Sequence, residues 1–400
     1  MEKIGIGRIT LKKQTRANVL KIIKNEGPIS RVDIAARLGL TRAAITIISD
    51  DLISAGLISE IGSNIREGKK AQGRRKVLLD INANFKFAFG IFVNSNHISM
   101  GLSTLCGDSL DKINYELKPG EYTLNGFVDM VKNTFNQLLT GNYLEQEKII
   151  GIGVGCDDSF ADAIGIDTTN CQSIIAKALH EAMDMPVCVE YANLTLALAN
   201  IYFPEKHDDI VVSDAIFLQC SKRFGMIEFS GTNNSIEMKN DWTYIDDYVI
   251  NFNGRKCEGC VQGSLSAEIS YDAVRQKISE QCPEINSEIV EMILQGYNSE
   301  SVQKAIDTKN ECIEMFATFL FNLAQTKKVQ KIILHKFHFS DFDYVYLIKY
   351  LETKFSESNA ASLISKSRIN ESYSFLGGCA IAVREFFVEC GGLDLKVKSK

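Results

Sequence analysis

Three short helical patterns follow one another between residues 15 and 57, and their order constrains the fold more than any other feature of the chain. The first pattern ends at Gly27-Pro28, because neither residue continues a helix well. Ser30 is a good N-cap for the second helix, and Gly39 can adopt the left-handed conformation that closes it. Thr41 is a good N-cap for the third helix. Together with the strand pattern that follows, this arrangement is typical of a winged helix-turn-helix.

The third helix carries the side chains that a DNA-reading helix needs. Its apolar stripe predicts the buried side (Ala44, Ile45, Ile48, Leu52, Ile53), which leaves short or basic residues outside (Arg42, Ala43, Thr46, Ser49). Short side chains allow a helix to enter the major groove, and an Arg can donate two hydrogen bonds to guanine. We therefore predict DNA contacts from Ser30, Arg31, Thr41, Arg42, Ala43 and Thr46. The alternative is a three-helix module that binds another protein.

A polar, basic and glycine-rich stretch follows at residues 62–75, as expected for a wing or a DNA-facing loop. Within it, Arg74 and Arg75 suit the narrow minor groove of A·T-rich DNA. The alternative is a solvated basic linker, which would attract DNA without any preference for sequence.

The charge distribution separates a basic N-terminal part from an acidic remainder. Residues 1–85 hold 16 Lys and Arg against 8 Asp and Glu, whereas the whole chain of 400 residues has a net charge of −6. A basic head on an acidic body is typical of a nucleic-acid-binding module fused to a second function.

The same sequence indicates a cytoplasmic protein. No apolar run reaches the roughly 18 residues that a membrane span needs, and residues 1–8 lack the apolar core of a signal peptide. The eleven Cys are scattered without a disulfide framework, which predicts reduced thiols.

The body is expected to begin near Lys76, with strand patterns at 77–82, 87–94 and 98–104. Further strands are expected at 148–155, 187–190, 211–220 and 332–334, and helices at 125–139, 174–183, 193–202, 342–354, 374–387 and across 264–325. Strands followed by crossover helices, twice over, predict two α/β lobes with a cleft between them. The predicted domains are a head at 1–80, a first lobe at 81–200 and a second lobe at 201–400, with a helical insertion and a final helix that returns to the first lobe.

Three segments carry a resemblance to a known family: Gly73-Arg-Arg-Lys-Val-Leu-Leu-Asp-Ile-Asn, Val189-Glu-Tyr-Ala-Asn-Leu and Ser374-Phe-Leu-Gly-Gly-Cys-Ala-Ile-Ala-Val. In this order, and after a helix-turn-helix, they resemble the ROK family, which groups bacterial transcriptional repressors with sugar kinases. The resemblance implies two actin-like (ribonuclease H-like) α/β lobes that bind a sugar between them, with ATP also bound in the kinases. The predicted fold class is thus α/β, with an N-terminal winged helix-turn-helix.

The positions that imply kinase chemistry in the family are replaced here. Phe92 stands where an acid opens the first phosphate turn, Ser221-Lys-Arg replaces the second turn, and His335-Lys336 replaces a glycine pair on the adenosine side. The catalytic Asp aligns with Ala192, which cannot accept a proton. A slip of one residue places Tyr191 there, and its pKa of about 10 makes it a poor base at neutral pH. A slip of two residues would place Glu190, but the other losses would remain, so we expect no kinase activity.

The zinc signature of the family is altered as well. In the same register Asp247 replaces a His, Cys257 is kept, and Gly259 and Ser264 replace two Cys. A structural zinc ion needs four ligands, mostly nitrogen or sulfur. We expect no cofactor; the alternatives are zinc held by Asp247, Cys257 and the displaced Cys260 with one further ligand, or a redox pair of the two Cys.

The sugar-contacting positions of the family align with Tyr191, Ala192, Tyr244, Asp247 and Ser266. Carboxylates and amides bind vicinal hydroxyls, and aromatic rings support the apolar face of a sugar. We therefore expect a small molecule to contact Asn94, Glu190, Tyr191, Tyr244 and Asp247. The alternative is that these side chains only fill the cleft.

Together these patterns predict a transcriptional regulator, a repressor of a carbohydrate-related operon, whose kinase-like effector domain has lost its catalytic residues. Its expected partners are double-stranded DNA, a second copy of itself in a homodimer or tetramer, and a small sugar, with no membrane. Two alternatives remain: a ROK sugar kinase with a DNA-binding head, and a regulator that responds to no ligand.

Overall fold

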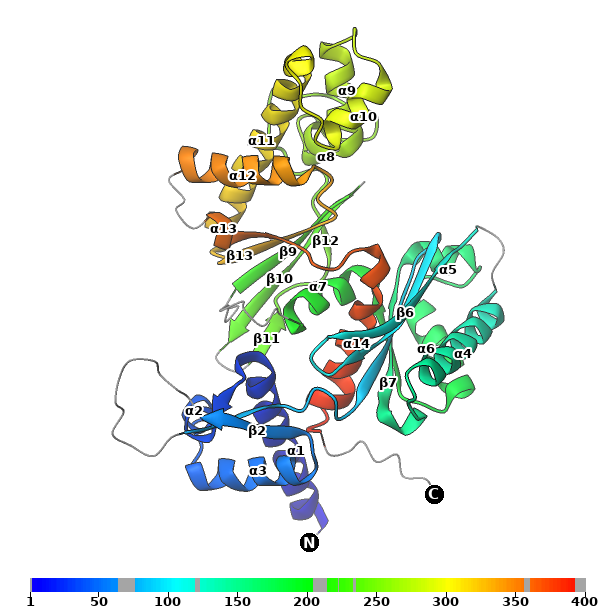
Figure 1. Ribbon diagram of the computed structural model, residues 1–400, viewed down its shortest axis with the longest axis vertical. Coiled ribbons are helices and arrows are strands. Elements are labelled where there is room, and N and C mark those ends of the chain that lie inside the picture. The colour runs from blue at the N-terminus through cyan, green and yellow to red at the C-terminus, as the bar shows by residue number, and fades with distance from the viewer. Residues whose placement is uncertain are drawn as a thin grey trace. The chain divides into compact units, whose positions relative to one another are not determined.

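The computed structural model describes residues 2–63, 76–118, 123–203, 214–221, 223–232, 235–355 and 360–392, without the side chains of residues 2–10, 63, 232 and 235–237. The chain divides into two compact units (Figure 1). Unit 1 comprises Met1–Val211, Thr232–Ser235 and Ile369–Lys400, and unit 2 comprises Val212–Gly231 and Ile236–Arg368.

The head of unit 1 is a winged helix-turn-helix, as predicted. Its elements are α1 (Glu2–Glu26), β1 (Ile29–Ser30), α2 (Arg31–Leu38), α3 (Arg42–Ser54), β2 (Ile58–Ser63) and β3 (Val77–Ile81). Strand β3 lies between β1 and β2 and is antiparallel to both. The expectation that the body begins near Lys76 is therefore wrong, because among the described strands β3 pairs with β1 and β2 of the head and buries Leu79 and Ile81 there.

The rest of unit 1 is built on a five-stranded sheet of order β6-β5-β4-β7-β8. Its strands are β4 (Phe87–Val93), β5 (His97–Thr104), β6 (Ser109–Glu116), β7 (Ile149–Cys156) and β8 (Val187–Tyr191). The first three are antiparallel neighbours, whereas β7 and β8 join in parallel. The helices of this unit are α4 (Leu124–Gly141), α5 (Asp158–Ala163), α6 (Cys171–Met183), α7 (Ala192–Tyr202) and α14 (Phe375–Val383), which continues as a π-helical turn (Arg384–Val388).

Both faces of this sheet are covered, which explains why every residue of β4 is buried. Alternate side chains of β4, including Phe89 and Ile91, pack with Phe127 and Phe135 of α4 in one hydrophobic core. Helix α14 lies against β4 and β7 and also contacts α7. The final helix thus returns to the first lobe, although about 220 residues of sequence separate it from β7.

Unit 2 is the second α/β lobe, with sheet order β11-β10-β9-β13-β14 and β12 paired to β10. The strands are β9 (Asp214–Cys220), β10 (Phe224–Thr232), β11 (Ser235–Met238), β12 (Thr243–Tyr244), β13 (Lys331–His335) and β14 (Ile364–Lys366). The helices are α8 (Leu265–Ile269), α9 (Tyr271–Gln281), α10 (Ser287–Leu294), α11 (Gln303–Lys327), α12 (Asp341–Lys354) and α13 (Ala360–Leu363). One large core joins the sheet to these helices, so the two predicted α/β lobes are confirmed.

Helix α14 approaches the sheet of unit 1 so closely that only glycine fits at the contact. A Cβ atom at Gly153 would overlap the carbonyl oxygen of Gly378, and one at Gly378 would overlap that of Gly153. In the same way, a Cβ atom at Gly90 would overlap the carbonyl oxygen of Phe375. The glycines of the closing segment therefore serve packing.

Within the part of the chain that the structure describes, no helix combines the length and the apolar character needed to cross a bilayer.

Replacing Gly153 with Ala is expected to destabilise unit 1 by about 3 kcal/mol, because the added methyl group meets backbone atoms that cannot rotate away. Urea unfolding followed by circular dichroism measures this change. The matched control is Gly126→Ala in α4, where an added Cβ meets only the Thr123 hydroxyl at 3.4 Å. That substitution should stabilise the helix by about 0.5–1 kcal/mol, and an equal urea midpoint for both variants would contradict the packing argument.

His335 gives unit 2 a dependence on pH. Its ring is buried, stacks on Phe217 with 5.3 Å between ring centroids, and places Nδ1 3.1 Å from the Ser367 hydroxyl. Burial, and to a lesser extent the nearby Lys336, lowers the pKa of His335 to about 3. The unfolded chain takes up this proton near pH 6.5, so the stability due to neutral His335 is complete above that pH and is lost as the pH falls towards 3.

Between pH 7 and pH 5 this residue is expected to lower the free energy of unfolding by about 2 kcal/mol. Thermal unfolding at the two pH values, for the wild type and His335→Gln, tests this. The variant should lose less stability over that interval, and an identical loss in both proteins would show that His335 is not the group responsible.

Candidate nucleic-acid interface and ligand positions

The turn between α2 and α3 is held by the residues that the sequence marks as caps. The Ser30 hydroxyl donates to Asp33 Oδ2 (2.6 Å) and accepts from the Asp33 backbone N–H (3.2 Å). The hydrogen bond from Ser30 lowers the pKa of Asp33, and the hydrogen bond from Lys76 lowers it further, to a lesser extent. Gly39 has φ 63°, and its N–H donates to the Ala35 carbonyl. At the start of α3, Thr41 Oγ1 accepts from the Ala44 N–H at 3.2 Å.

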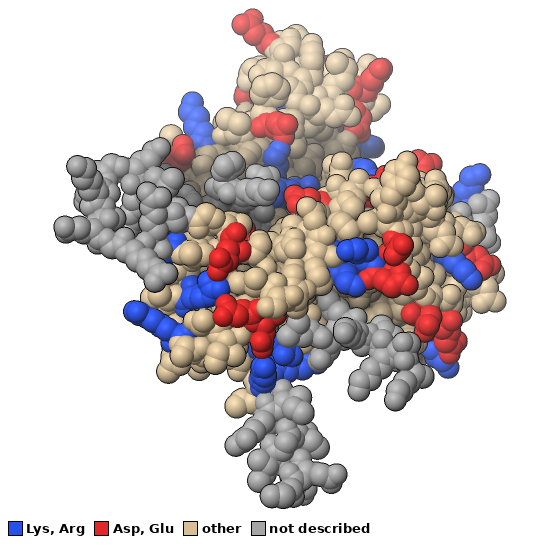
Figure 2. Space-filling view, turned by 60° about the horizontal axis from the view of Figure 1, so that its bottom comes forward, with Lys and Arg blue, Asp and Glu red and all other residues tan. Residues whose placement is uncertain are grey.

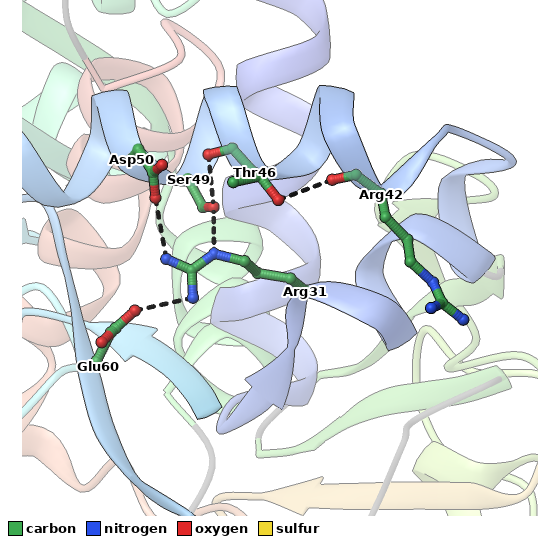
Figure 3. Close-up of polar contacts among 6 residues, drawn as sticks. All are labelled: Arg31, Arg42, Thr46, Ser49, Asp50 and Glu60. Atoms are coloured by element: carbon green, nitrogen blue, oxygen red, sulfur yellow. Dashed lines mark hydrogen bonds and ion pairs between the residues drawn. The ribbon is translucent and has the colours of Figure 1, made fainter. Parts of the chain in front are cut away.

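Arg31 links α2 to both α3 and strand β2 through hydrogen bonds (Figure 3). Its Nε donates to Ser49 Oγ (2.8 Å), Nη1 to Glu60 Oε1 (2.8 Å) and Nη2 to Asp50 Oδ1 (3.1 Å). All three nitrogens of the guanidinium are thus engaged within the head. The expectation that Ser49 faces outward is wrong, because Ser49 is fully buried and donates to the Thr46 carbonyl at 3.1 Å.

Arg42 differs from Arg31 in both exposure and partners. Its side chain is exposed, and no hydrogen bond or ion pair reaches its guanidinium from any residue that the structure describes (Figure 3). The Thr46 hydroxyl donates to the Arg42 carbonyl at 2.9 Å, and Ala43 is also exposed. Helix α3 therefore presents one available cation next to small side chains.

Ion pairs within the head neutralise most of its described acidic groups. Besides Arg31, the pairs are Arg37–Glu26, Lys76–Asp33 and Lys12–Asp51, each about 3.0 Å long. Figure 2 shows basic and acidic side chains interspersed over the face in view, without an extended region of one sign. Five basic residues, namely Arg66, Lys69, Lys70, Arg74 and Arg75, lie outside the described residues, so the predicted contacts of Arg74 and Arg75 stay predictions.

Three of the predicted ligand residues lie at one edge of the sheet in unit 1. Strands β4, β7 and β8 are parallel, with Val93, Cys156 and Tyr191 in one row, so Asn94, Glu190 and Tyr191 stand at neighbouring carboxyl ends. The Asn94 side-chain oxygen accepts from the backbone N–H groups of residues 96 and 97, at 2.9 and 2.8 Å. Tyr191 is 46% exposed.

The neighbouring side chains at this edge are one apolar ring, one methyl group and one carboxyl group. Phe92 is buried within β4, and Ala192 is buried at the first position of α7. Burial raises the pKa of Glu190, and the nearby Arg384 opposes this shift. Glu190 is therefore the acidic group of β8 at this edge, beside the phenol of Tyr191.

The other two ligand candidates belong to unit 2. Tyr244 is exposed on β12, and the guanidinium of Arg223 lies 3.7 Å from its ring centroid. Arg223 also pairs with Asp246 at 3.0 Å, whereas Asp247 is exposed. The five candidates are thus divided between the units, three in unit 1 and two in unit 2.

The structure brings the two cysteines of the altered zinc signature together, but not Asp247. Cys257 and Cys260 lie next to each other, with Cα atoms 5.4 Å apart. The expectation of reduced thiols stays a prediction for this pair. Six of the other Cys are buried, namely Cys156, Cys171, Cys220, Cys282, Cys312 and Cys379. Across the described residues, no cluster of three or more His, Cys, Asp or Glu side chains is arranged to hold a metal ion.

Lys336, which replaces a glycine of the family, has φ 53°. This left-handed conformation favours glycine, because a Cβ atom there approaches the following carbonyl oxygen. The backbone at this position thus has a conformation that favours glycine, as the resemblance to the family implies.

Sequence reasoning missed one residue of the α3 surface. Ile47 is 61% exposed and follows Thr46 on the face that also carries Ala43. The signal was available, because Ile47 falls outside the apolar stripe of Ile45, Ile48 and Leu52, which are all buried.

Comparisons with known proteins agree with this architecture. Residues 13–61 match the model of the MarR family. A putative xylose repressor of Caldicellulosiruptor sp. (strain Rt8B.4) is 28% identical over 145 residues, which is 36% of this chain and 35% of that protein, so the chain spans about a third of its length. The DNA-binding transcriptional dual regulator NagC of Escherichia coli (strain K12) is 25% identical over 302 residues, or 74% of this chain and 69% of NagC.

Two solved structures show the same fold. A ROK family transcriptional regulator, a homolog of the E. coli MLC protein, superposes with a TM-score of 0.64 at 16% identity, covering 96% of this chain and 98% of that chain. A ROK hexokinase from Thermus thermophilus gives a TM-score of 0.52 at 14% identity, covering 74% of this chain and 97% of that one. The chain therefore combines a MarR-type helix-turn-helix with the fold of the ROK regulators, and the resemblance predicted from the sequence is confirmed.

Replacing Arg31 with Met is expected to destabilise the head by about 1–2 kcal/mol, because Asp50 and Glu60 lose their shared cation and Ser49 loses a charged donor. Urea unfolding measures the change, and Arg37→Met is the control, since its pair with Glu26 is half exposed on the Arg side and is worth less than about 1 kcal/mol. Adding Asp50→Asn and Glu60→Gln to Arg31→Met should recover part of the loss. Equal midpoints for the two Arg variants would argue against a special role for Arg31.

Proposed function

We propose that this chain, which has the fold of the ROK regulators, is a DNA-binding transcriptional regulator and a repressor of carbohydrate-related genes. The observation that carries this proposal is the surface of α3, where exposed Ala43 and Thr46 stand next to Arg42. The guanidinium of Arg42 pairs with none of the described residues, and caps at Thr41 hold the start of the helix. In helix-turn-helix proteins, the N-terminal residues of this helix contact base edges in the major groove. The net positive charge of residues 1–85 supports the same partner.

The predicted DNA residues divide into two roles in this proposal. Arg42, Ala43 and Thr46 contact DNA, because their side chains are exposed. Ser30, Arg31 and Thr41 position α2 and α3, since their polar atoms are engaged in caps and ion pairs. Arg74 and Arg75 are proposed to add minor-groove contacts from the segment between β2 and β3, on the grounds of sequence alone.

We further propose that the body, residues 81–200 and 201–400 after a head of residues 1–80, senses a small molecule and does not phosphorylate it. Ala192 and Phe92 have no group that accepts a proton, which argues against kinase chemistry. The name of the xylose repressor relative favours a sugar as the effector. The ligand contacts would come from Asn94, Glu190, Tyr191, Tyr244 and Asp247.

A cytoplasmic homodimer or tetramer fits this function best. Two heads about one DNA turn apart, roughly 34 Å, would read a near-palindromic site. The protein would have two states that differ in the spacing of the heads. An effector could release DNA only if it binds these two states with different affinity.

A regulator without a ligand is the second candidate. It is favoured by Asn94, whose side-chain oxygen already accepts two backbone hydrogen bonds, and by Arg223, which is held by Asp246 and Tyr244. Thermal midpoints measured with a panel of sugars separate the two candidates, because a bound ligand stabilises the folded state by mass action.

Selection of genomic fragments by the purified protein at near-physiological salt tests the DNA-binding function. We expect a few near-palindromic sites to be enriched, and we expect Arg42→Ala to weaken binding to them by about 10- to 100-fold, since one good Arg contact to a base is worth about 1–3 kcal/mol. The control is Lys349→Ala, which removes an exposed cation from α12 in unit 2. Retention that ignores sequence and vanishes with added salt would contradict the proposal.

A further inference from the structure

Helix α3 presents a strip of apolar groups to the outside of the head. Ala43, Thr46 and Ile47 are all exposed, and their spacing of three and four residues places them on one side of the helix. Ile47 is 61% exposed, more than any other large apolar side chain described between residues 12 and 118. Arg42, the first residue of α3, directly precedes Ala43 on this side.

The hydroxyl of Thr46 has no hydrogen left to donate to a partner in this arrangement. It donates to the Arg42 carbonyl at 2.9 Å within the helix (Figure 3). Once that bond is made, Thr46 adds its methyl group to the exposed strip, beside an oxygen that can only accept. The strip therefore consists of one methyl from Ala43, one from Thr46 and the branched side chain of Ile47.

The strip has no role in the core of the head. The inner side of α3 is filled by Ile45, Ile48 and Leu52, each at most 8% exposed. An exposed isoleucine gains nothing from burial and forms helix less readily than alanine. Ile47 is thus free of any role in the core and open to an external partner with apolar groups.

In the major groove the C5-methyl group of thymine is the apolar feature that a side chain can contact. Resting on the proposed function, we propose that α3 reads thymines: Ile47 packs on a thymine methyl group, and the methyl groups of Ala43 and Thr46 extend the contact to neighbouring bases. Arg42 would then contact a guanine or a phosphate at the end of the same half-site. Ile47 is the specificity-determining residue of this surface.

Uracil in place of thymine tests the proposal, because it removes only the methyl group. The probes are sites enriched by the wild-type protein from a random duplex library, synthesised again with each thymine replaced in turn by uracil. For the wild type, one or two replacements in each half-site should weaken binding about fourfold each, the value of one buried methyl-sized group. Ile47→Ala should bind the thymine sites more weakly and lose its sensitivity to uracil at those positions.

Two controls keep the result clear. Val345→Ala shortens an aliphatic side chain of similar exposure, 64%, on α12 of unit 2, and should leave both the affinity and the uracil effect unchanged. Ile47→Ala should keep the thermal midpoint of the wild type, because the side chain is exposed and alanine favours helix.

The outcomes separate this proposal from the function on which it rests. If specific sites are enriched but uracil changes wild-type affinity nowhere, or if Ile47→Ala keeps the full uracil effect, the thymine contact is overturned and the DNA-binding function stands. If the library yields no specific site, the function itself fails and the thymine contact with it. An exposed strip that serves a protein partner would give the first of these results.

Discussion

The contact of Arg31 with Ser49, Asp50 and Glu60 fixes the geometry on which the DNA-binding surface depends. One guanidinium joins three elements, namely α2, α3 and β2. It also neutralises two carboxylates at the edge of the surface that would face phosphate groups. The same side chain therefore helps to orient α3 and neutralises two carboxylates beside it, whereas Arg42 pairs with none of the described residues.

The division of labour between these two arginines follows from their surroundings. Arg31 begins α2, where the carboxylates of α3 and β2 lie within hydrogen-bond distance. Arg42 begins α3, beyond the reach of any described acidic group. In the body, by contrast, Phe92 and Ala192 are both buried within regular elements, where neither side chain offers a group that accepts a proton.

Local signals in the sequence were sufficient for the helices of the head, because Ser30, Gly39 and Thr41 each act on backbone groups within four residues. Local signals were not sufficient for features that depend on distant partners. The pairing of β3 and the burial of Ser49 are decided by strands and by an arginine elsewhere in the chain, which periodicity does not report. The ligand candidates were found by alignment alone, and their grouping at the carboxyl ends of β4 and β8 needed the sheet register.

The glycine contact of α14 has a consequence for the order in which the chain acquires its structure. A ribosome releases residues from the N-terminus onward, so β4 and β7 emerge long before Phe375–Val383, the helix that covers them. All segments of unit 2 are complete by residue 368. The second lobe can therefore finish folding while the first still exposes one apolar face, and contacts of such large sequence separation form slowly. The first lobe of the body, whose strands are made first, is therefore the last to bury both faces of its sheet.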